Sequence, residues 1–138
     1  MNTAIVAIGS NIDPDVHIPR ALRLLGKEQR LRDTSDFMQT APEGFKDQPD
    51  FQNGAACVET AMDLESFRAY LKELEITLGR KKGPIKAGPR IIDLDLIYWN
   101  GSILHSDYEK YYTRQPVDQL IERLSLTVQD RKNISPEA

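Results

Sequence analysis

Cysteine and long apolar runs are both scarce in this 138-residue chain. Cys57 is the only cysteine, which excludes an internal disulfide and is typical of a reducing cytoplasm, where we expect the protein to be located. Its apolar neighbours, Ala56 and Val58, favour a buried core thiol over a nucleophile. No apolar run reaches the roughly 20 residues that cross a bilayer, and the apolar start lacks the basic region of a signal peptide. We therefore expect no membrane partner.

Aromatic residues and positive charge are also limited. Aromatic residues make up 7% of the chain, and the formal net charge is -3. Both values argue against a general nucleic-acid-binding surface, which needs basic patches and exposed rings. The remaining composition, 40% hydrophobic and 28% charged, predicts a single globular domain over residues 1–138.

Apolar periodicity predicts an α+β fold. We expect strands over residues 3–8, 30–40, 51–60 and 91–99, and helices over 16–26, 64–78 and 116–126. A turn is expected at residues 9–11, and loops at 41–50 and 80–90. Asp63 and Gly79 bound the clearest helix, Gly26 ends the first one, and Pro116 suits the first turn of the last. The order β-α-β-β-α-β predicts a ferredoxin-like fold, an antiparallel-rich sheet with helices packed on it.

The most informative pattern is a pair of aspartates inside an apolar run. Side chains of a strand alternate between faces, so Asp93 and Asp95 point to one side, while Ile92, Leu94 and Leu96 point to the other. Two half-buried carboxylates repel each other, and leaving them unpaired costs free energy or shifts a pKa. A cation is therefore expected beside them, and a hard divalent ion is the natural candidate.

A basic loop leads directly into this pair. Its cations are Arg80, Lys81, Lys82, Lys86 and Arg90, with no acidic residue among them. Arginine offers forked donors for phosphate oxygens, and lysine offers a mobile charge. A basic run by itself is usually a solvated loop. Next to paired aspartates it favours a site that holds a metal–nucleotide and stabilises phosphoryl transfer.

A third pattern lies at the start of the strand expected over 51–60. Phe51 and Asn53 are two residues apart, so a flat ring and an amide share one face. This pairing suits a planar heteroaromatic ligand, because the ring stacks while the amide donates and accepts hydrogen bonds. Alone, the pair more often means a core phenylalanine beside a hairpin asparagine.

Together these patterns resemble one enzyme family. The matching blocks are Gly9-Ser10-Asn11, Thr40-Ala41-Pro42 with Asp47 to Asn53, Glu75 with Leu78-Gly79-Arg80, and Gly88 to Leu96. Over about residues 3–101 the chain resembles the 6-hydroxymethyl-7,8-dihydropterin pyrophosphokinase family of folate biosynthesis. The resemblance implies a monomeric ferredoxin-like enzyme that transfers pyrophosphate from ATP to the pterin hydroxymethyl group and releases AMP.

The resemblance also implies roles for individual residues. Two Mg²⁺ ions would be held by Asp93 and Asp95, which form the catalytic set with the triphosphate-binding residues Arg80, Lys82 and Arg90. Further nucleotide contacts would come from Glu75 and Leu96. The pterin pocket would consist of Gly9, Thr40, Pro42, Phe51 and Asn53. The family has no dedicated general base, so catalysis would rest on metal activation, positioning and charge neutralisation.

The chain departs from the family in three places. Ala87 stands where a tryptophan usually precedes the Gly-Pro-Arg block. Lys82 stands where arginine is typical, which gives up bidentate phosphate geometry. In residues 102–138 the family's histidine, arginine and second pterin-stacking aromatic are not readable. The candidates for the missing histidine and ring are His105, Tyr108, Tyr111 and Tyr112.

Three functions are compatible with these observations. The preferred one is a Mg²⁺-dependent pyrophosphokinase whose partners are small molecules. A catalytically weak homologue that binds pterin or nucleotide and serves a partner protein is the first alternative, suggested by the missing ring. The second is a ferredoxin-like nucleic-acid-binding module that uses the 80–90 loop, against which the net charge of -3 stands.

Overall fold

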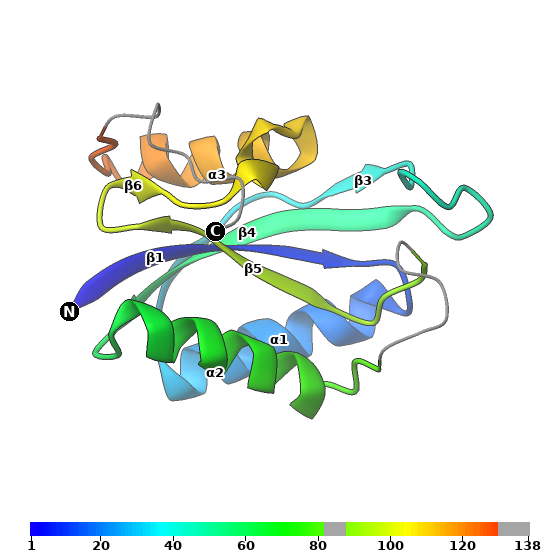
Figure 1. Ribbon diagram of the computed structural model, residues 1–138, viewed down its shortest axis with the longest axis horizontal. Coiled ribbons are helices and arrows are strands. Elements are labelled where there is room, and N and C mark those ends of the chain that lie inside the picture. Colours follow the sequence, from blue (N-terminus) through cyan, green and yellow to red (C-terminus); the bar gives the residue numbers. More distant parts are fainter. Residues whose placement is uncertain (82–87, 130–138) are drawn as a thin grey trace.

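The structure is a computed structural model that describes residues 1–81 and 88–129. Along the chain it contains β1 (Asn2–Ser10), α1 (Pro14–Glu28), β2 (Arg30–Thr34), β3 (Met38–Thr40), β4 (Phe51–Thr60), α2 (Leu64–Thr77), β5 (Asp93–Trp99), β6 (Ser102–Ile103), the 3-10 helix η1 (Ser106–Glu109) and α3 (Tyr111–Arg123) (Figure 1). The expected α+β class is confirmed. No helix in the described ranges has both the length and the apolar character that crossing a bilayer requires.

The strands form one antiparallel sheet. Its order is β2-β4-β1-β5-β6, and β3 also pairs with β4. The central strand, β1, pairs with β4 on one side and with β5 on the other. This register places Gly9 opposite both Asn53 and Asp93, and Ala7 opposite Asp95. Residues from three distant segments therefore lie side by side at one end of the sheet.

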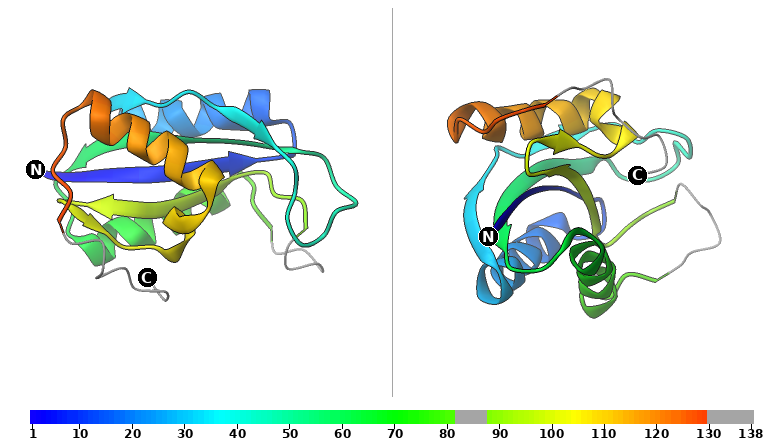
Figure 2. Two further views of the ribbon diagram at one scale, coloured as in Figure 1. Left: turned by 90° about the horizontal axis from the view of Figure 1, so that it is seen from above. Right: turned by 60° about the vertical axis from the view of Figure 1, so that its left-hand side comes forward.

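Helices cover both faces of the sheet (Figures 1 and 2). On one face α1 and α2 bury an apolar cluster that includes Val6 and Ile8 of β1 and Phe67 of α2. On the other face α3 packs over Ile5 and Cys57, and the thiol is fully buried as the sequence predicted. Successive side chains of β1 point to opposite faces of the sheet, so this strand contributes to the apolar core on each face.

Several element boundaries differ from the expectations. The first helix continues through Gly26 to Glu28, and β1 includes two residues of the expected turn. The expected strand 30–40 is divided into β2 and β3. Between them the Phe37 ring lies against Gly54, where a Cβ atom would come within 2.5 Å of it. This close contact lies between the last pair of β2 with β4, Thr34 with Ala56, and the first pair of β3, Met38 with Asn53.

Of the two helices near the site, α2 begins where the sequence predicted and α3 does not. Asp63 caps α2 as predicted, because its side chain accepts a hydrogen bond of 2.8 Å from the Ser66 amide. The last helix instead begins at Tyr111, so Pro116 lies inside it rather than in its first turn. Burial of Thr113 and Val117 on the same helical stripe stabilises this longer helix despite the missing proline N–H.

Candidate active site

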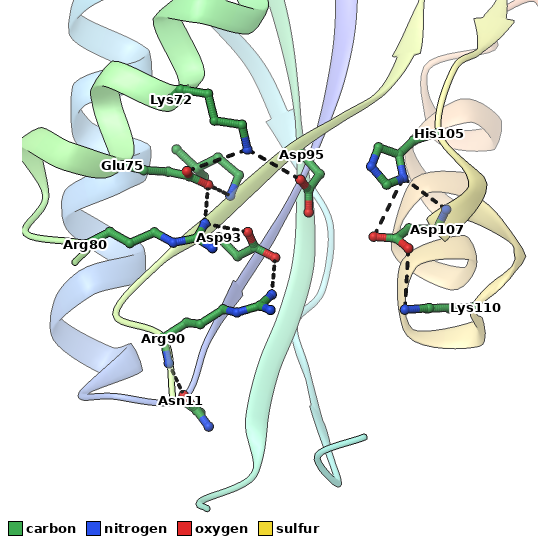
Figure 3. Close-up of polar contacts among 11 residues, drawn as sticks. Asn11, Lys72, Glu75, Arg80, Arg90, Asp93, Asp95, His105, Asp107 and Lys110 are labelled. Carbon is green, nitrogen blue, oxygen red and sulfur yellow. Dashed lines mark hydrogen bonds and ion pairs between the residues drawn. The ribbon is translucent and has the colours of Figure 1, made fainter. Parts of the chain in front are cut away.

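The two aspartates share one face of β5, as the alternation predicted. Their side chains are 22% and 21% exposed, whereas the neighbouring Leu94 and Leu96 are buried on the opposite face. β5 thereby presents two carboxyl groups to a cavity while it anchors itself in the core. Figure 3 shows Asp93 and Asp95 with the cations around them.

Asp93 is paired with two guanidinium groups. Arg80 Nη1 lies 2.7 Å from its Oδ1 atom, and Arg90 Nη1 lies 3.2 Å from its Oδ2 atom. Burial opposes ionisation, but the charges of Arg80 and Arg90 hold the pKa of Asp93 below its usual value. Two members of the predicted catalytic set therefore meet the first aspartate directly.

Asp95 has a different environment. Within the described residues its only cationic neighbour in ion-pair range is Lys72, whose Nζ atom lies 3.9 Å from Oδ1. Burial and the adjacent Asp93 charge raise the pKa of Asp95 to about 8. A carboxyl group that lacks a close positive partner favours an added cation.

Glu75 fixes the geometry around this pair. It is only 4% exposed, and its Oε2 atom accepts bonds of 2.7 Å from the Leu94 amide and 2.8 Å from Arg80. Burial raises its pKa, and these hydrogen bonds and charges oppose the shift. In this structure Glu75 joins α2 to β5 and orients Arg80. Its predicted contact with a nucleotide stays a prediction.

A cavity of about 260 Å³ opens beside the aspartates. Its lining includes four of the five residues predicted for the pterin pocket, Gly9, Thr40, Phe51 and Asn53, together with Asp93 and Asp95. Asn53 Nδ2 donates a 2.7 Å hydrogen bond to Thr40 Oγ1, which orients the amide. Pro42 is buried outside the lining, and its carbonyl accepts a bond from Lys46.

Residues of η1, of α3 and of the junction between them form the far wall of this cavity. They are Asp107, Lys110, Tyr112 and Thr113. Lys110 Nζ lies 3.4 Å from Asp107 Oδ1 and 5.8 Å from the centre of the Tyr112 ring. Sequence reasoning missed Thr113 because it began the last helix at Pro116 instead of Tyr111. It also missed Asp107 in η1 and Lys110 at the junction of η1 and α3, for which no local pattern gave a signal.

The structure separates the four candidates for the missing histidine and ring. Tyr112 lines the cavity, whereas Tyr108 is fully buried with its hydroxyl on Asp118, and Tyr111 is 57% exposed. His105 caps η1, with Nδ1 accepting a hydrogen bond of 3.0 Å from the Asp107 amide. His105 lines a second cavity instead.

This second cavity has a volume of about 310 Å³. It lies between α2 and β5, and its lining includes Lys72, Leu96 and His105. Asp95 lines both cavities. Leu96 lines this cavity, and its predicted contact with a nucleotide stays a prediction. Lys82 falls outside the described residues.

Asn11 is a further residue whose importance the sequence did not reveal. It is 4% exposed, and its Oδ1 atom accepts a 2.8 Å hydrogen bond from the Arg90 amide. Its Nδ2 group donates to Gln48 Oε1 at 2.8 Å and to the Pro49 carbonyl at 3.0 Å. Asn11 therefore connects the end of β1 to both loops that approach the site, a long-range role that no local motif predicts.

The donor set fits a magnesium ion that arrives with phosphate. Among residues 1–81 and 88–129 no group of three or more histidine, cysteine or acidic side chains converges as a metal site. Mg²⁺ commonly takes one or two protein carboxylates and completes its octahedron with water and substrate phosphates. Asp93 and Asp95 can supply those carboxylates.

Comparison with known proteins agrees with this geometry. The family model described as 7,8-dihydro-6-hydroxymethylpterin-pyrophosphokinase (HPPK) matches residues 5–126. The chain belongs to the HPPK family. The match includes most of the region after Gly101, where the sequence departs from the family's recognisable motifs.

Named relatives of the HPPK family show the same similarity. The chain is 31% identical over 135 residues to the bifunctional protein FolKE of Lactococcus lactis strain IL1403, covering 89% of this chain and 38% of that protein. It is 27% identical to the 2-amino-4-hydroxy-6-hydroxymethyldihydropteridine pyrophosphokinase of Bacillus subtilis, and the match covers 89% of this chain and 80% of that protein. A folic acid synthesis protein of Schizosaccharomyces pombe is 36% identical over 107 residues, and the match covers 75% of this chain and 14% of that protein. The chain thus spans less than half the length of several relatives.

Proposed function

We propose that this protein transfers pyrophosphate from ATP to the hydroxymethyl group of 6-hydroxymethyl-7,8-dihydropterin. One observation carries the proposal: Asp95 lines both cavities, so a pterin in one and a nucleotide in the other would meet at its carboxyl group. The pterin hydroxyl oxygen would attack the β-phosphorus. The bond from that phosphorus to the α,β-bridging oxygen would break, AMP would leave, and the hydroxyl proton would pass to solvent.

The first cavity suits the pterin. Phe51 would stack on the planar ring, and Asn53 would bond its polar edge through an amide that Thr40 already orients. Tyr112 is our candidate for the second ring, because it lines the same cavity from the α3 side. Gly9 lines the cavity and has no Cβ atom that would displace Asn53, and Pro42 would support the pocket from outside its lining.

The second cavity suits the nucleotide. Leu96 offers an apolar surface there, and Arg80 and Arg90 lie at the aspartates, where a triphosphate would need neutralising charge. Lys82 and Glu75 remain predicted nucleotide contacts. Asp93 and Asp95 would hold the two Mg²⁺ ions, which when bound would neutralise phosphate charge and activate the attacking hydroxyl. The chain's own contribution is orientation and electrostatic stabilisation.

One assay tests this proposal. The protein is incubated with ATP, Mg²⁺ and 6-hydroxymethyl-7,8-dihydropterin, and AMP is measured for the wild type and for Asp95→Ala. We expect AMP from the wild type and a loss of at least a hundredfold, about 2.7 kcal/mol, in the variant. Pterin binding without AMP would instead favour a catalytically weak homologue that serves a partner protein.

Three further statements stay predictions. They are a monomeric working unit, a location in the cytoplasm and a single domain over residues 1–138. Analytical ultracentrifugation tests the first, fractionation of the source cells tests the second, and a single cooperative unfolding transition would support the third.

A further inference from the structure

Lys72 reaches from α2 to the edge of the aspartate pair. Its Nζ atom lies 3.6 Å from Glu75 Oε1 and 3.9 Å from Asp95 Oδ1, as Figure 3 shows. Both distances exceed those of a normal N–H···O hydrogen bond. The side chain is 61% exposed, so the ammonium group is held loosely by charge rather than fixed by geometry.

Neither carboxylate explains the position of Lys72 as a structural ion pair. Glu75 already accepts hydrogen bonds from the Leu94 amide and from Arg80. Asp95 would gain more from a cation at bonding distance than from one at 3.9 Å. Exposed ion pairs of this kind contribute about 0–1 kcal/mol to folding. A role in ligand binding accounts better for an ammonium group aimed at this carboxylate.

The surroundings of Lys72 favour an anionic ligand. Lys72 lines the 310 Å³ cavity next to Asp95 and Leu96, where we place the nucleotide. Arg68 and His105 line the same cavity, and Glu65 is the other acidic residue there. Of the cations lining this cavity, Lys72 is the one whose charged group lies within 4 Å of Asp95 among the described residues, where the phosphate chain would run.

We propose that Lys72 is a mobile phosphate-binding cation of the nucleotide site. In the free protein its ammonium group lies beside the Asp95 carboxyl group. When a divalent cation binds Asp95, like-charge repulsion displaces the ammonium group, and the flexible lysine stem lets it move to a phosphate oxygen of the nucleotide. No hydrogen bond of ordinary length has to break for this movement. This inference rests on the proposed function and adds a nucleotide contact to it.

The inference makes opposite predictions for nucleotide and for metal alone. Lys72→Gln removes a charged phosphate contact, so the Kd for Mg²⁺–ATP should rise about tenfold. The same change removes a cation that competes for Asp95, so Mn²⁺ binding in the absence of nucleotide should be equal or tighter. Lys72→Arg should retain most of the ATP affinity. Lys27→Gln, which removes the same charge from an exposed position on α1, is the matched control.

Isothermal titration calorimetry with Mg²⁺–ATP and electron paramagnetic resonance titration with Mn²⁺ measure these affinities on the full chain, with thermal unfolding as a check on the fold. The expected result is weaker ATP binding only in Lys72→Gln, with an unfolding midpoint close to that of the wild type. Unchanged ATP affinity, or parallel losses of ATP affinity, Mn²⁺ affinity and stability, would overturn the inference. Absence of ATP binding in the wild type would overturn the proposed function as well.

Discussion

Gly9 lies directly opposite Asn53 on the neighbouring strand, and a Cβ atom at Gly9 would come within 2.8 Å of Asn53 Oδ1. A contact this short requires the Asn53 side chain, which donates a hydrogen bond to Thr40, to shift. The absence of a side chain on one strand therefore sets the position of a binding group on the next.

Gly9→Ala should weaken pterin binding by about tenfold or more, because the displaced amide loses its orientation. Binding of Mg²⁺–ATP should change little. Calorimetry with each ligand separately measures the two effects. Gly26→Ala is the matched control, since a Cβ atom there meets Leu31 only at 3.8 Å. Equal pterin affinity in Gly9→Ala and wild type would contradict the placement of the pterin.

Gly26→Ala should itself change the stability of the protein. Gly26 lies inside α1, where alanine has the higher helix propensity and the added methyl group fits. Gly26→Ala should raise the free energy of unfolding by about 0.5–1 kcal/mol. Urea unfolding measures the change, and a destabilised variant would show that the helix end is less regular than described.

The aspartates should respond differently to neutralisation when a chelator is present. Asp93→Asn leaves Arg80 and Arg90 without their shared carboxylate, which should cost about 1–3 kcal/mol of unfolding free energy. The pKa of Asp95 is raised to about 8, so at pH 7 the group is largely protonated, and its only contact with a cation is the one with Lys72 at 3.9 Å among the described residues. Asp95→Asn at pH 7 should therefore leave the free energy of unfolding within about 0.5 kcal/mol of the wild type or raise it. Urea unfolding in excess chelator compares the two variants. Equal destabilisation would contradict the unequal pairing.

Asn11→Asp tests the connection between the two loops. The substituted carboxylate can still accept from the Arg90 amide, but it cannot donate to Gln48 or Pro49. Gln48 cannot turn its amide to compensate without losing its 2.6 Å bond to the Phe45 carbonyl. We expect a loss of about 1–3 kcal/mol in urea unfolding. A variant as stable as the wild type would contradict the connecting role of Asn11.

The Cys57 thiol should be unreactive in the native protein. Burial raises its pKa to about 11, so at pH 8 only roughly one thiol in a thousand is ionised, and the group is also inaccessible. Ellman's reagent should label the native protein slowly and the urea-unfolded protein quickly. Rapid labelling of the native state would contradict the buried position.

Local patterns predicted the parts of the site that depend on local geometry. Strand alternation placed Asp93 and Asp95 on one face, and capping signals placed α2. The α3 part of the far wall, with Thr113, was missed because Pro116 resembled a helix start, whereas the helix begins at Tyr111 and buries Thr113 and Val117. The contacts of Asn11 with Arg90 and of Lys72 with Asp95 join distant segments of the chain, which residue periodicity does not encode.

The most direct test of the account is phosphorus NMR of a mixture of the protein, ATP, Mg²⁺ and 6-hydroxymethyl-7,8-dihydropterin. The account predicts that the ATP signals are replaced by those of AMP and of a diphosphate ester of the pterin, with no ADP. It also predicts that Asp95→Ala leaves ATP intact. Unchanged ATP with the wild type, ADP as the product, or equal turnover in Asp95→Ala would contradict the account.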